Sequence, residues 1–233
     1  MAKRKHQQDN VVQLLRESED TYVKNVNPVT PSQAQMLEAI DNVPVVFSIG
    51  PAGTGKTYLA CVKAVEYLLN GQCRKIVITR PALESVGEHL GFLPGSLENK
   101  LHPFLRPCIE ALTERLSRQR FKKYLEEGVI EFVSFAHMRG RTFNNTFIIA
   151  DEMQNATPEG MKMLITRIGF NSQVVICGDL TQSDLPKGEV SGLADAMERF
   201  RDADLVEFVT FNPDDVVRSE VVSELLECYD EEA

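Results

Sequence analysis

The chain has 233 residues, of which 43% are hydrophobic and 25% are charged, and its formal net charge is −9. This balance is typical of a soluble globular protein with one substantial α/β domain, or one domain with a modest extension. It argues against a broad basic surface that wraps nucleic acid, although a local basic channel is compatible with it. No apolar run approaches the roughly 18 residues that cross a bilayer, and no apolar stretch follows the basic start, so we expect neither a membrane partner nor a secretory signal.

The start of the chain, residues 1–28, is polar and is predicted to be an N-terminal extension. The domain itself is expected to occupy residues 29–233. Its first helix should begin after Thr30, because threonine is a favoured N-cap, Pro31 suits the first turn and Gln33 would close a capping box.

Short apolar runs then alternate with helical stretches. Each run is too short for a helix, is rich in β-branched residues and shows little polar alternation, which is typical of strands buried on both faces of a parallel sheet. The alternation predicts a doubly wound α/β fold, with helices on both faces of the sheet. The predicted strands are Val45–Ile49, Ile76–Thr79, Val129–Val133, Phe147–Ala150, Val174–Cys177 and Leu205–Thr210.

The longest helical stretch outside this pattern, Leu97–Leu125, is predicted to be an insertion or lid. It carries a basic cluster with one interleaved aromatic residue, Phe121. The cluster could contact nucleic-acid phosphates, but a solvated helix face is the commoner meaning of such a run. Its members are Arg115, Arg118, Arg120, Lys122 and Lys123.

The segment GPAGTGKT fits the phosphate-binding pattern G-x-x-x-x-G-K-[ST] in full. A predicted strand precedes it and a helical stretch, Tyr58–Leu69, follows it, which is the context that this motif requires. Glycines are needed because successive backbone N–H groups must turn inward around phosphate oxygens, beside the positive end of the helix dipole. Lys56 would supply charge to the β- and γ-phosphates, and the Thr57 hydroxyl would bind Mg²⁺. The expected nucleotide-binding residues here are Gly50, Pro51, Ala52, Gly53, Thr54, Gly55, Lys56, Thr57 and Tyr58.

Two carboxylates, Asp151 and Glu152, end the predicted strand Phe147–Ala150. In a P-loop enzyme such a strand is expected to lie beside the P-loop strand, so that its end meets the metal and the γ-phosphate. Asp151 would then hold Mg²⁺, usually through water, and Glu152 would orient and deprotonate the attacking water. The alternative is that both acids only cap the next helix, since acids favour helix N-termini.

Gln182 follows the next predicted strand, in the segment Gly178-Asp179-Leu180-Thr181-Gln182. An amide can both donate and accept hydrogen bonds, so a glutamine here could contact the γ-phosphate and report its presence. The alternative is a polar loop with an Asx-type turn at Asp179. Because parallel strand ends converge on one edge of the sheet, we favour the functional interpretation.

These elements and the segments between them closely resemble the PhoH-like family of P-loop ATPases, which is related to the first lobe of superfamily 1 helicases. The resemblance covers roughly residues 30–225. Two departures are Ser219, where a histidine is expected, and Ser85-Val86, which interrupts the usual spacing. The matching segments are GPAGTGKTY (50–58), TRP (79–81), GE (87–88), LGFLPG (90–95), RGRT (139–142), DEMQN (151–155), GD (178–179) with Gln182, and DVVR (215–218).

The resemblance implies a RecA-like P-loop NTPase fold of a single lobe that binds and hydrolyses ATP with Mg²⁺. It further implies remodelling of RNA or single-stranded nucleic acid, and a ring-shaped homo-oligomer, with a hexamer favoured. Gln33 resembles the adenine-reading glutamine found upstream of the P-loop in helicase lobes, although capping-box chemistry alone would also place a glutamine there. Neither a PIN-type nuclease nor a KH-type RNA-binding segment is expected.

Phosphoryl transfer needs positive charge on the γ-phosphate beyond Lys56 and Mg²⁺. Helicases take it from a second lobe, but only residues 219–233 follow Arg218, so we expect a neighbouring subunit to complete the site. Arg218 is the leading candidate for this trans-acting role, and the alternative is a salt bridge with Glu220 or Glu224. The rival arginines are Arg80, which could reach the phosphates in cis, Arg139 and Arg141.

The cysteines are odd in number, scattered, and never form a CxxC pair. They mostly lie in apolar segments, so we interpret them as reduced core residues and expect a cytoplasmic protein. The histidines at 89, 102 and 137 lack metal-ligand spacing and are interpreted as structural. The cysteines are Cys61, Cys73, Cys108, Cys177 and Cys228.

Three functions compete. The leading hypothesis is an ATPase motor that acts on RNA or single-stranded nucleic acid. The second is a nucleotide-gated binding or scaffold protein with slow turnover and no unwinding activity. The third, a small-molecule kinase, is disfavoured because Glu152 beside Asp151, with Gln182 beyond, fits water activation better than transfer to an acceptor hydroxyl.

Overall fold

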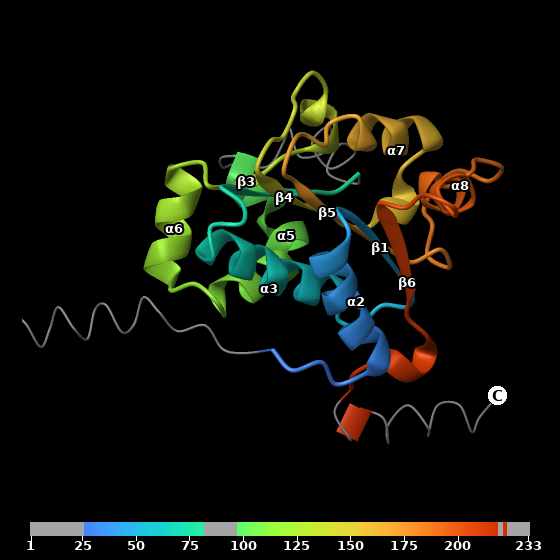
Figure 1. Ribbon diagram of the computed structural model, residues 1–233, viewed down its shortest axis with the longest axis horizontal. Coiled ribbons are helices and arrows are strands. Elements are labelled where there is room, and N and C mark those ends of the chain that lie inside the picture. Colours follow the sequence, from blue (N-terminus) through green and yellow to red (C-terminus); the bar gives the residue numbers. More distant parts are fainter. Residues whose placement is uncertain (1–25, 82–96, 219–220, 223–233) are drawn as a thin grey trace, which may run out of the picture.

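One parallel sheet organises the protein (Figure 1). The computed structural model describes residues 26–81, 97–218 and 221–222. In this part of the chain, six strands lie in the order β3-β2-β4-β5-β1-β6 and every pairing is parallel. Each predicted strand is confirmed, with ends that shift by one residue at most. The expectation that β4, which precedes Asp151, lies beside the P-loop strand β1 is wrong, because β5 lies between them and pairs with both. The bounds are β1 Val45–Ile49, β2 Lys75–Thr79, β3 Ile130–Phe132, β4 Thr146–Ala150, β5 Gln173–Gly178 and β6 Val206–Thr210.

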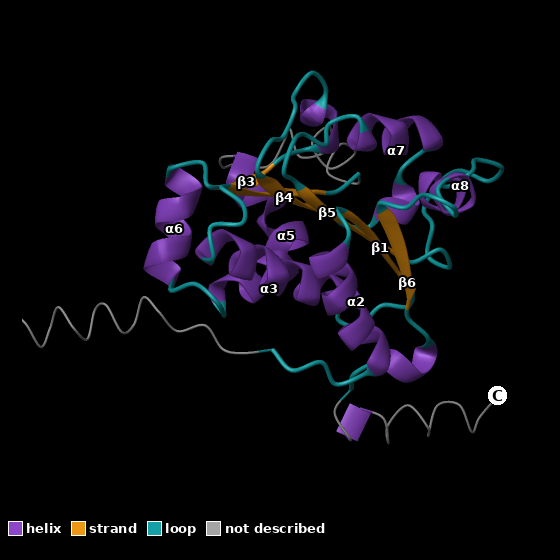
Figure 2. Ribbon diagram, viewed as in Figure 1, coloured by secondary structure: helices purple, strands orange, loops and turns teal. Residues whose placement is uncertain are grey.

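Helices cover both faces of the sheet, as predicted (Figure 2). Successive side chains of a strand point to opposite faces, so Phe147 and Ile149 of β4 enter the cluster under α2, α3 and α5, while Ile148 enters the cluster under α7 and α8. The helices are α2 Pro31–Asn42, α3 Lys56–Leu69, α5 Leu97–Thr113, α6 Arg118–Glu126, α7 Pro158–Ile165 and α8 Gly192–Arg199. Short 3₁₀ turns lie at η2 Phe135–Met138, η3 Met153–Asn155 and η4 Pro213–Asp215.

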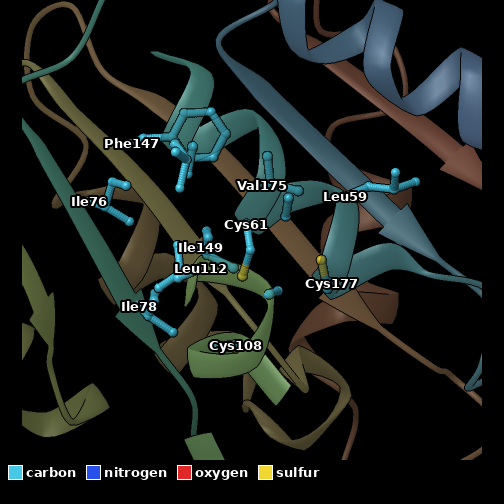
Figure 3. Packing of buried hydrophobic residues seen from close by; sticks show 14 of the residues in the cluster. Leu59, Cys61, Ile76, Ile78, Cys108, Leu112, Phe147, Ile149, Val175 and Cys177 are labelled. Atoms are coloured by element: carbon cyan, nitrogen blue, oxygen red, sulfur yellow. The ribbon is translucent and has the colours of Figure 1, made fainter. Parts of the chain in front are cut away.

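The stretch predicted as an insertion or lid is not one continuous helix, and its first part is a core helix and not a lid. It breaks into α5 and α6, and Ser117 caps α6 by accepting a hydrogen bond from the Arg120 N–H. Helix α5 packs against α3, with Cys108 and Leu112 buried against the sheet (Figure 3). The apolar residues of α5 recur at helical spacing, so they form a layer of the core.

The start of α2 agrees with the prediction only in part. Thr30 is the N-cap, and its hydroxyl accepts from the Gln33 N–H at 3.3 Å. The returning half of the capping box is wrong, because the Gln33 side-chain oxygen accepts from the Val29 N–H at 2.9 Å instead of the Thr30 N–H. The reason is that the other end of the same amide is bonded to Thr54 O in the P-loop, at 3.2 Å.

Four cysteines, Cys61, Cys73, Cys108 and Cys177, are buried and free, as expected. Cys61, Cys108 and Cys177 lie in one cluster around α3 (Figure 3). Within the described ranges, no helix has the length and hydropathy that a bilayer crossing requires. Cys228, the predicted extension before residue 26 and the segments at 87–88 and 90–95 lie outside the described residues.

Candidate active site

The residues predicted for phosphate and metal chemistry meet at one edge of the sheet, beyond the carboxyl ends of β1, β2, β4 and β5. They surround a cavity of about 330 Å³. Parallel strands end at the same edge of the sheet. Motifs that lie more than a hundred residues apart in the chain, such as the P-loop and Gln182, therefore converge here. The lining residues are Ala52, Gly53, Gly55, Lys56, Thr57, Tyr58, Arg80, Pro107, Asp151, Glu152, Gly178, Asp179 and Gln182.

The P-loop turns sharply between β1 and α3. Gly50, Gly53 and Gly55 have φ values of 147°, 83° and 86°, a region that favours glycine. Gly50 has a second constraint, because a Cβ there would stand 2.4 Å from Phe211 O, where the chain leaves β6. The backbone at Phe211 therefore lies against Gly50 and leaves no room for a side chain there.

Lys56 is the first residue of α3 and is 9% exposed. Its ammonium donates to Gly50 O and Pro51 O, each at 2.6 Å. Burial lowers the pKa of Lys56, and the nearby carboxylates of Asp179, Asp151 and Glu152 oppose that shift. The ammonium is thus held at the cavity by backbone carbonyls that a phosphate could replace.

Thr57 and Asp151 form a direct contact across the cavity floor. The Thr57 hydroxyl donates to Asp151 Oδ1 at 2.7 Å, and the Asp151 N–H donates to Thr79 O at 2.9 Å. Burial raises the pKa of Asp151, and the hydrogen bond from Thr57 opposes this. A hydroxyl and a carboxylate are oxygen ligands that suit Mg²⁺, which usually keeps waters and phosphate oxygens as its other ligands. The described residues hold no group of three His, Cys, Asp or Glu that could hold a metal ion.

Glu152 has both carboxylate oxygens engaged. Oε1 lies 2.7 Å from Arg80 Nη2, and Oε2 accepts from Gln154 Nε2. The backbone at Glu152 is left-handed, with φ 54°, and its side chain pairs with Arg80, the residue that follows β2. Glu152 therefore lies in the cavity as predicted, but in a pose restrained by two neighbours.

Gln154 was not among the predicted site residues, although it lies in the DEMQN segment. It is 1% exposed, and its Oε1 accepts from the Asp179 N–H at 3.1 Å. Its Nε2 also donates to Gln182 O at 3.3 Å. One amide thus connects the acidic end of β4 to the loop after β5. The available signal was a glutamine two residues after the acid pair, inside the DEMQN segment.

The loop after β5 contains the Asx-type turn that was one of its two predicted interpretations. Asp179 Oδ1 accepts from the Thr181 N–H at 2.9 Å and from the Thr181 hydroxyl at 2.7 Å, which is an Asx-type turn. The Gln182 side chain is exposed and lines the cavity. The turn therefore presents Gln182 to the site. Asp179 Oδ2 is buried with no hydrogen-bond partner among the described residues.

A family model described as PhoH-like protein matches residues 25–230. The chain belongs to this family. A PhoH-like protein of Bacillus subtilis (strain 168) is 47% identical over 209 residues, which cover 90% of this chain and 65% of that protein. A PhoH-like protein of Mycobacterium leprae (strain TN) is 49% identical over 208 residues, 89% of this chain and 59% of that protein. Protein PhoH of Escherichia coli (strain K12) is 41% identical over 222 residues, 93% of this chain and 61% of that protein.

The chain thus spans about three fifths of the length of the curated PhoH relatives that it matches. Among solved structures, the large terminase of a thermophilic bacteriophage superposes with a TM-score of 0.54 at 12% identity, over 86% of this chain and 49% of that chain. At that identity the likeness concerns the fold alone. The predicted P-loop NTPase fold, a parallel sheet between two layers of helices, is confirmed.

A second cavity of about 320 Å³ adjoins the P-loop of this PhoH-family chain. It shares Gly55 and Tyr58 with the first cavity, so the two are neighbours along the start of α3. Gln33, the proposed adenine reader, lines it and is 6% exposed. The other lining residues are Val26, Asn27, Val29, Leu59, Arg115 and Val217.

The predicted basic cluster is divided. Arg115 is 4% exposed and lines the second cavity. The prediction that it lies on a basic helix face is therefore wrong, because the chain turns after the end of α5 and directs this side chain inward. Phe121 is also buried, which removes the one aromatic residue of the cluster from the surface. Lys122 and Lys123 are exposed and lie 3.8 and 3.9 Å from Glu126 and Glu127, as on a solvated helix face.

The candidate arginines lie in different surroundings. Arg80 lines the first cavity beside Glu152, which agrees with a position for action in cis. Arg141 pairs with Glu131 at 2.6 Å and stacks over Phe143, away from the cavity. Arg139 and Arg218 are exposed. The suggested salt-bridge partners of Arg218 lie outside the described residues.

Proposed function

We propose that this chain binds ATP together with Mg²⁺ and hydrolyses it. The observation that carries the proposal is the contact between Thr57 and Asp151 at the floor of a cavity that Lys56 and Glu152 also line. A cation-binding pair, a phosphate-binding amine and a carboxylate base then surround one small volume. Water-mediated cleavage of a phosphate chain requires these parts together.

In this proposal the P-loop N–H groups and Lys56 bind the β- and γ-phosphates, and the ammonium exchanges the carbonyls of Gly50 and Pro51 for phosphate oxygens. Thr57 and Asp151 hold Mg²⁺, which when bound neutralises charge on the phosphates. Glu152 orients the attacking water and accepts its proton. Each Glu152 oxygen already interacts with one neighbour, Arg80 or Gln154, and each keeps a further lone pair that can accept from the water. Gln182 offers its amide to the γ-phosphate.

The base is proposed to be adenine, in the second cavity. Each end of the Gln33 amide makes one hydrogen bond, to Val29 and to Thr54, so one further donor and one further acceptor site remain. A glutamine amide of that kind matches the donor and acceptor atoms on one edge of adenine. The capping role and the base contact are thus compatible in the same side chain.

The direct test is phosphate release by the wild type and by Lys56→Ala. We expect Lys56→Ala to lose about 100-fold or more in rate, in line with the loss of one charge-stabilising group. Lys63→Met is the matched control, because Lys63 is a similarly buried lysine of the same helix that pairs with Asp41 and does not line the cavity. A wild-type protein that binds no adenine nucleotide with Mg²⁺ would refute the proposal. A phosphorylated small product in place of free phosphate would point to a kinase.

We further propose that Arg218 acts in trans on the site of a neighbouring copy, in a ring-shaped homo-oligomer. Support comes from its exposure and its position one residue after Val217, whose N–H donates to Gly53 O in the P-loop at 3.2 Å. If the proposal holds, Arg218→Ala and Lys56→Ala are each inactive alone, and mixing them restores part of the activity because some interfaces combine two intact halves. Undiminished hydrolysis by Arg218→Ala would end this assignment.

We propose RNA or single-stranded nucleic acid as the partner of the ATPase. The exposed basic residues of α6, such as Arg118 and Lys122, are the available surface for phosphate contacts. A motor should hydrolyse ATP faster when RNA or single-stranded DNA is added. A rate that stays slow and unstimulated would favour the alternative, a nucleotide-gated scaffold without unwinding activity.

A further inference from the structure

Arg115 is a buried arginine without a carboxylate partner among the described residues. It lies in the turn between α5 and α6 and is 4% exposed. Its Nη2 donates to the Tyr58 hydroxyl at 2.7 Å, and its guanidinium lies 5.8 Å from the centroid of the Tyr58 ring. Nε and Nη1 are buried with no hydrogen-bond partner in the described part of the chain.

Such a side chain opposes folding. A buried charge that is not paired carries a desolvation penalty, and unmet donors add to it. A neutral phenol is a weak compensation for a guanidinium. A methionine or leucine of similar size would fill the same space without that penalty, so packing alone does not account for an arginine here. Buried donors without partners are rare in folded proteins, and a bound group that supplies the acceptor is one explanation for them.

The second cavity provides that place. Arg115 lines it together with Gln33, Tyr58, Leu59 and Val217, and most of its exposed wall is apolar. The cavity begins at Gly55 and Tyr58, which also border the phosphate cavity. A nucleotide whose phosphates lie in the P-loop would therefore extend its base along Tyr58 toward Arg115.

Tyr58 is fixed in this wall from two sides. Its hydroxyl accepts from Arg115 and donates to Glu114 Oε2 at 3.1 Å. Tyr58 is 36% exposed as a residue and lines the second cavity, which leaves room beside it for a stacking partner. A ring that is already held in place loses little conformational entropy when a base stacks on it.

We propose that Arg115 is a specificity-determining residue for the base of the bound nucleotide: Tyr58 stacks on a purine, and the Arg115 guanidinium donates to one of its ring nitrogens. This inference rests on the proposed function, because it takes the P-loop as the phosphate site. A guanidinium has donors only, so it selects acceptor atoms, which purine ring nitrogens provide. Gln33 then contacts the edge of the base that distinguishes adenine from other purines. Arg115 donates to a different acceptor atom of the same base.

The test separates the base from the phosphates by measuring calorimetric affinity for ADP and for inorganic tripolyphosphate. In Arg115→Met we expect ADP to bind about 10- to 100-fold more weakly, the loss of one hydrogen bond to a charged group. Tripolyphosphate affinity should stay unchanged. Tyr58→Phe keeps the ring and removes only the hydroxyl, so its loss of ADP affinity should be smaller. Arg115→Lys should also lose affinity, since an ammonium lacks the planar fork of donors.

The melting temperature without nucleotide gives a second, independent measurement. We expect Arg115→Met to melt at the same or a higher temperature than the wild type, because an uncompensated buried charge is removed. A purely structural arginine would give the opposite sign. Unchanged ADP affinity in Arg115→Met, an equal loss for tripolyphosphate, or a loss in Tyr58→Phe as large as in Arg115→Met would each overturn the direct base contact.

Two outcomes in the wild type distinguish this inference from the proposed function. If the wild type binds tripolyphosphate but binds ADP no more tightly, base recognition is wrong while the phosphate site stands. If it binds neither ligand, the proposed function fails and the role of Arg115 fails with it.

Discussion

The hydroxyl of Thr57 donates a 2.7 Å hydrogen bond to Asp151 Oδ1, although the two residues lie 94 positions apart in the chain. Thr57 is in the first turn of α3, after β1, and Asp151 follows β4, with β5 between the two strands. The contact therefore joins the phosphate-binding loop to the acidic strand end across the width of a strand. It places a hydroxyl and a carboxylate where a single cation could bind both.

Asp151→Asn should abolish the gain in ATP affinity that Mg²⁺ provides. The amide keeps the shape of the side chain and can still accept from Thr57, but it lacks the charge that holds a divalent cation. Binding of ATP measured in the presence of a chelator should change little. Asp195→Asn, which removes an acid from an exposed pair with Arg199 on α8, is the control. An unaltered Mg²⁺ dependence in Asp151→Asn would contradict the assignment.

Glu152→Gln should retain ATP binding and lose hydrolysis by about 100-fold or more, the usual contribution of a general base. The glutamine can still interact with Gln154, so the cavity keeps its shape, but it cannot accept a proton. Single-turnover phosphate release and equilibrium nucleotide binding on the same sample separate the two effects. Hydrolysis at the wild-type rate would transfer the role of base to another group.

Gln154→Ala should lower both stability and turnover. The Asp179 N–H loses its buried acceptor, which costs about 1–3 kcal/mol in the free energy of unfolding. Glu152 and the loop that carries Gln182 lose a shared support, so we expect kcat to fall while KM for ATP changes little. Urea unfolding and steady-state phosphate release measure the two effects. A destabilised variant with normal kcat would make Gln154 a structural residue only.

Gly50→Ala should destabilise the protein more than Gly71→Ala does. Both glycines have positive φ, 147° and 72°, so both substitutions incur backbone strain. A Cβ at Gly50 would also stand 2.4 Å from the backbone oxygen of Phe211, whereas nothing lies within 4 Å of a Cβ at Gly71. The extra cost of displacing backbone is expected to be about 1–3 kcal/mol in urea unfolding. Equal losses of unfolding free energy in the two variants would show that the backbone at Phe211 can move away from a Cβ at position 50 without a measurable cost.

Glu131 should make the protein less stable as the pH falls into the acid range. Its burial favours the protonated form, but hydrogen bonds from Lys75 and Arg141 outweigh this and hold the pKa of Glu131 below its usual value. The folded state then binds this proton less readily than the unfolded state, so the contribution is present above about pH 4.3 and is lost as pH falls toward the folded pKa. In Glu131→Gln the melting temperature should be lower at neutral pH, and its difference from wild type should shrink in acid. Glu110→Gln, which removes the acid of an exposed pair with Arg106, is the control for loss of a surface ion pair at neutral pH.

The strands and the P-loop turn between β1 and α3 could be predicted because local signals determine them. Strands such as β4 are apolar on both faces, so burial in a parallel sheet is visible in five consecutive residues. Glycine spacing reports the P-loop, and convergence of strand ends then places Asp151 and Glu152 beside it.

What could not be predicted depends on contacts between distant segments. The Gln154 amide bonds to Asp179 and Gln182, 25 and 28 residues further along the chain, and no local pattern encodes that choice. Arg115 looked like one member of a basic run, because the break between α5 and α6 that turns it inward lies inside a stretch with continuous helical propensity. The same continuity made α5 look like a lid, although its apolar residues pack under the sheet.

The hydrogen bond from the Val217 N–H to Gly53 O ties the phosphate-binding loop to the chain segment that leaves η4. Entry of a phosphate that shifts Gly53 would move Val217 as well, and with it the exposed side chain that follows. Nucleotide binding in the cavity would then move the exposed residue that follows Val217 in the chain. A fluorophore attached at position 218 would report it as a change in emission on addition of ADP.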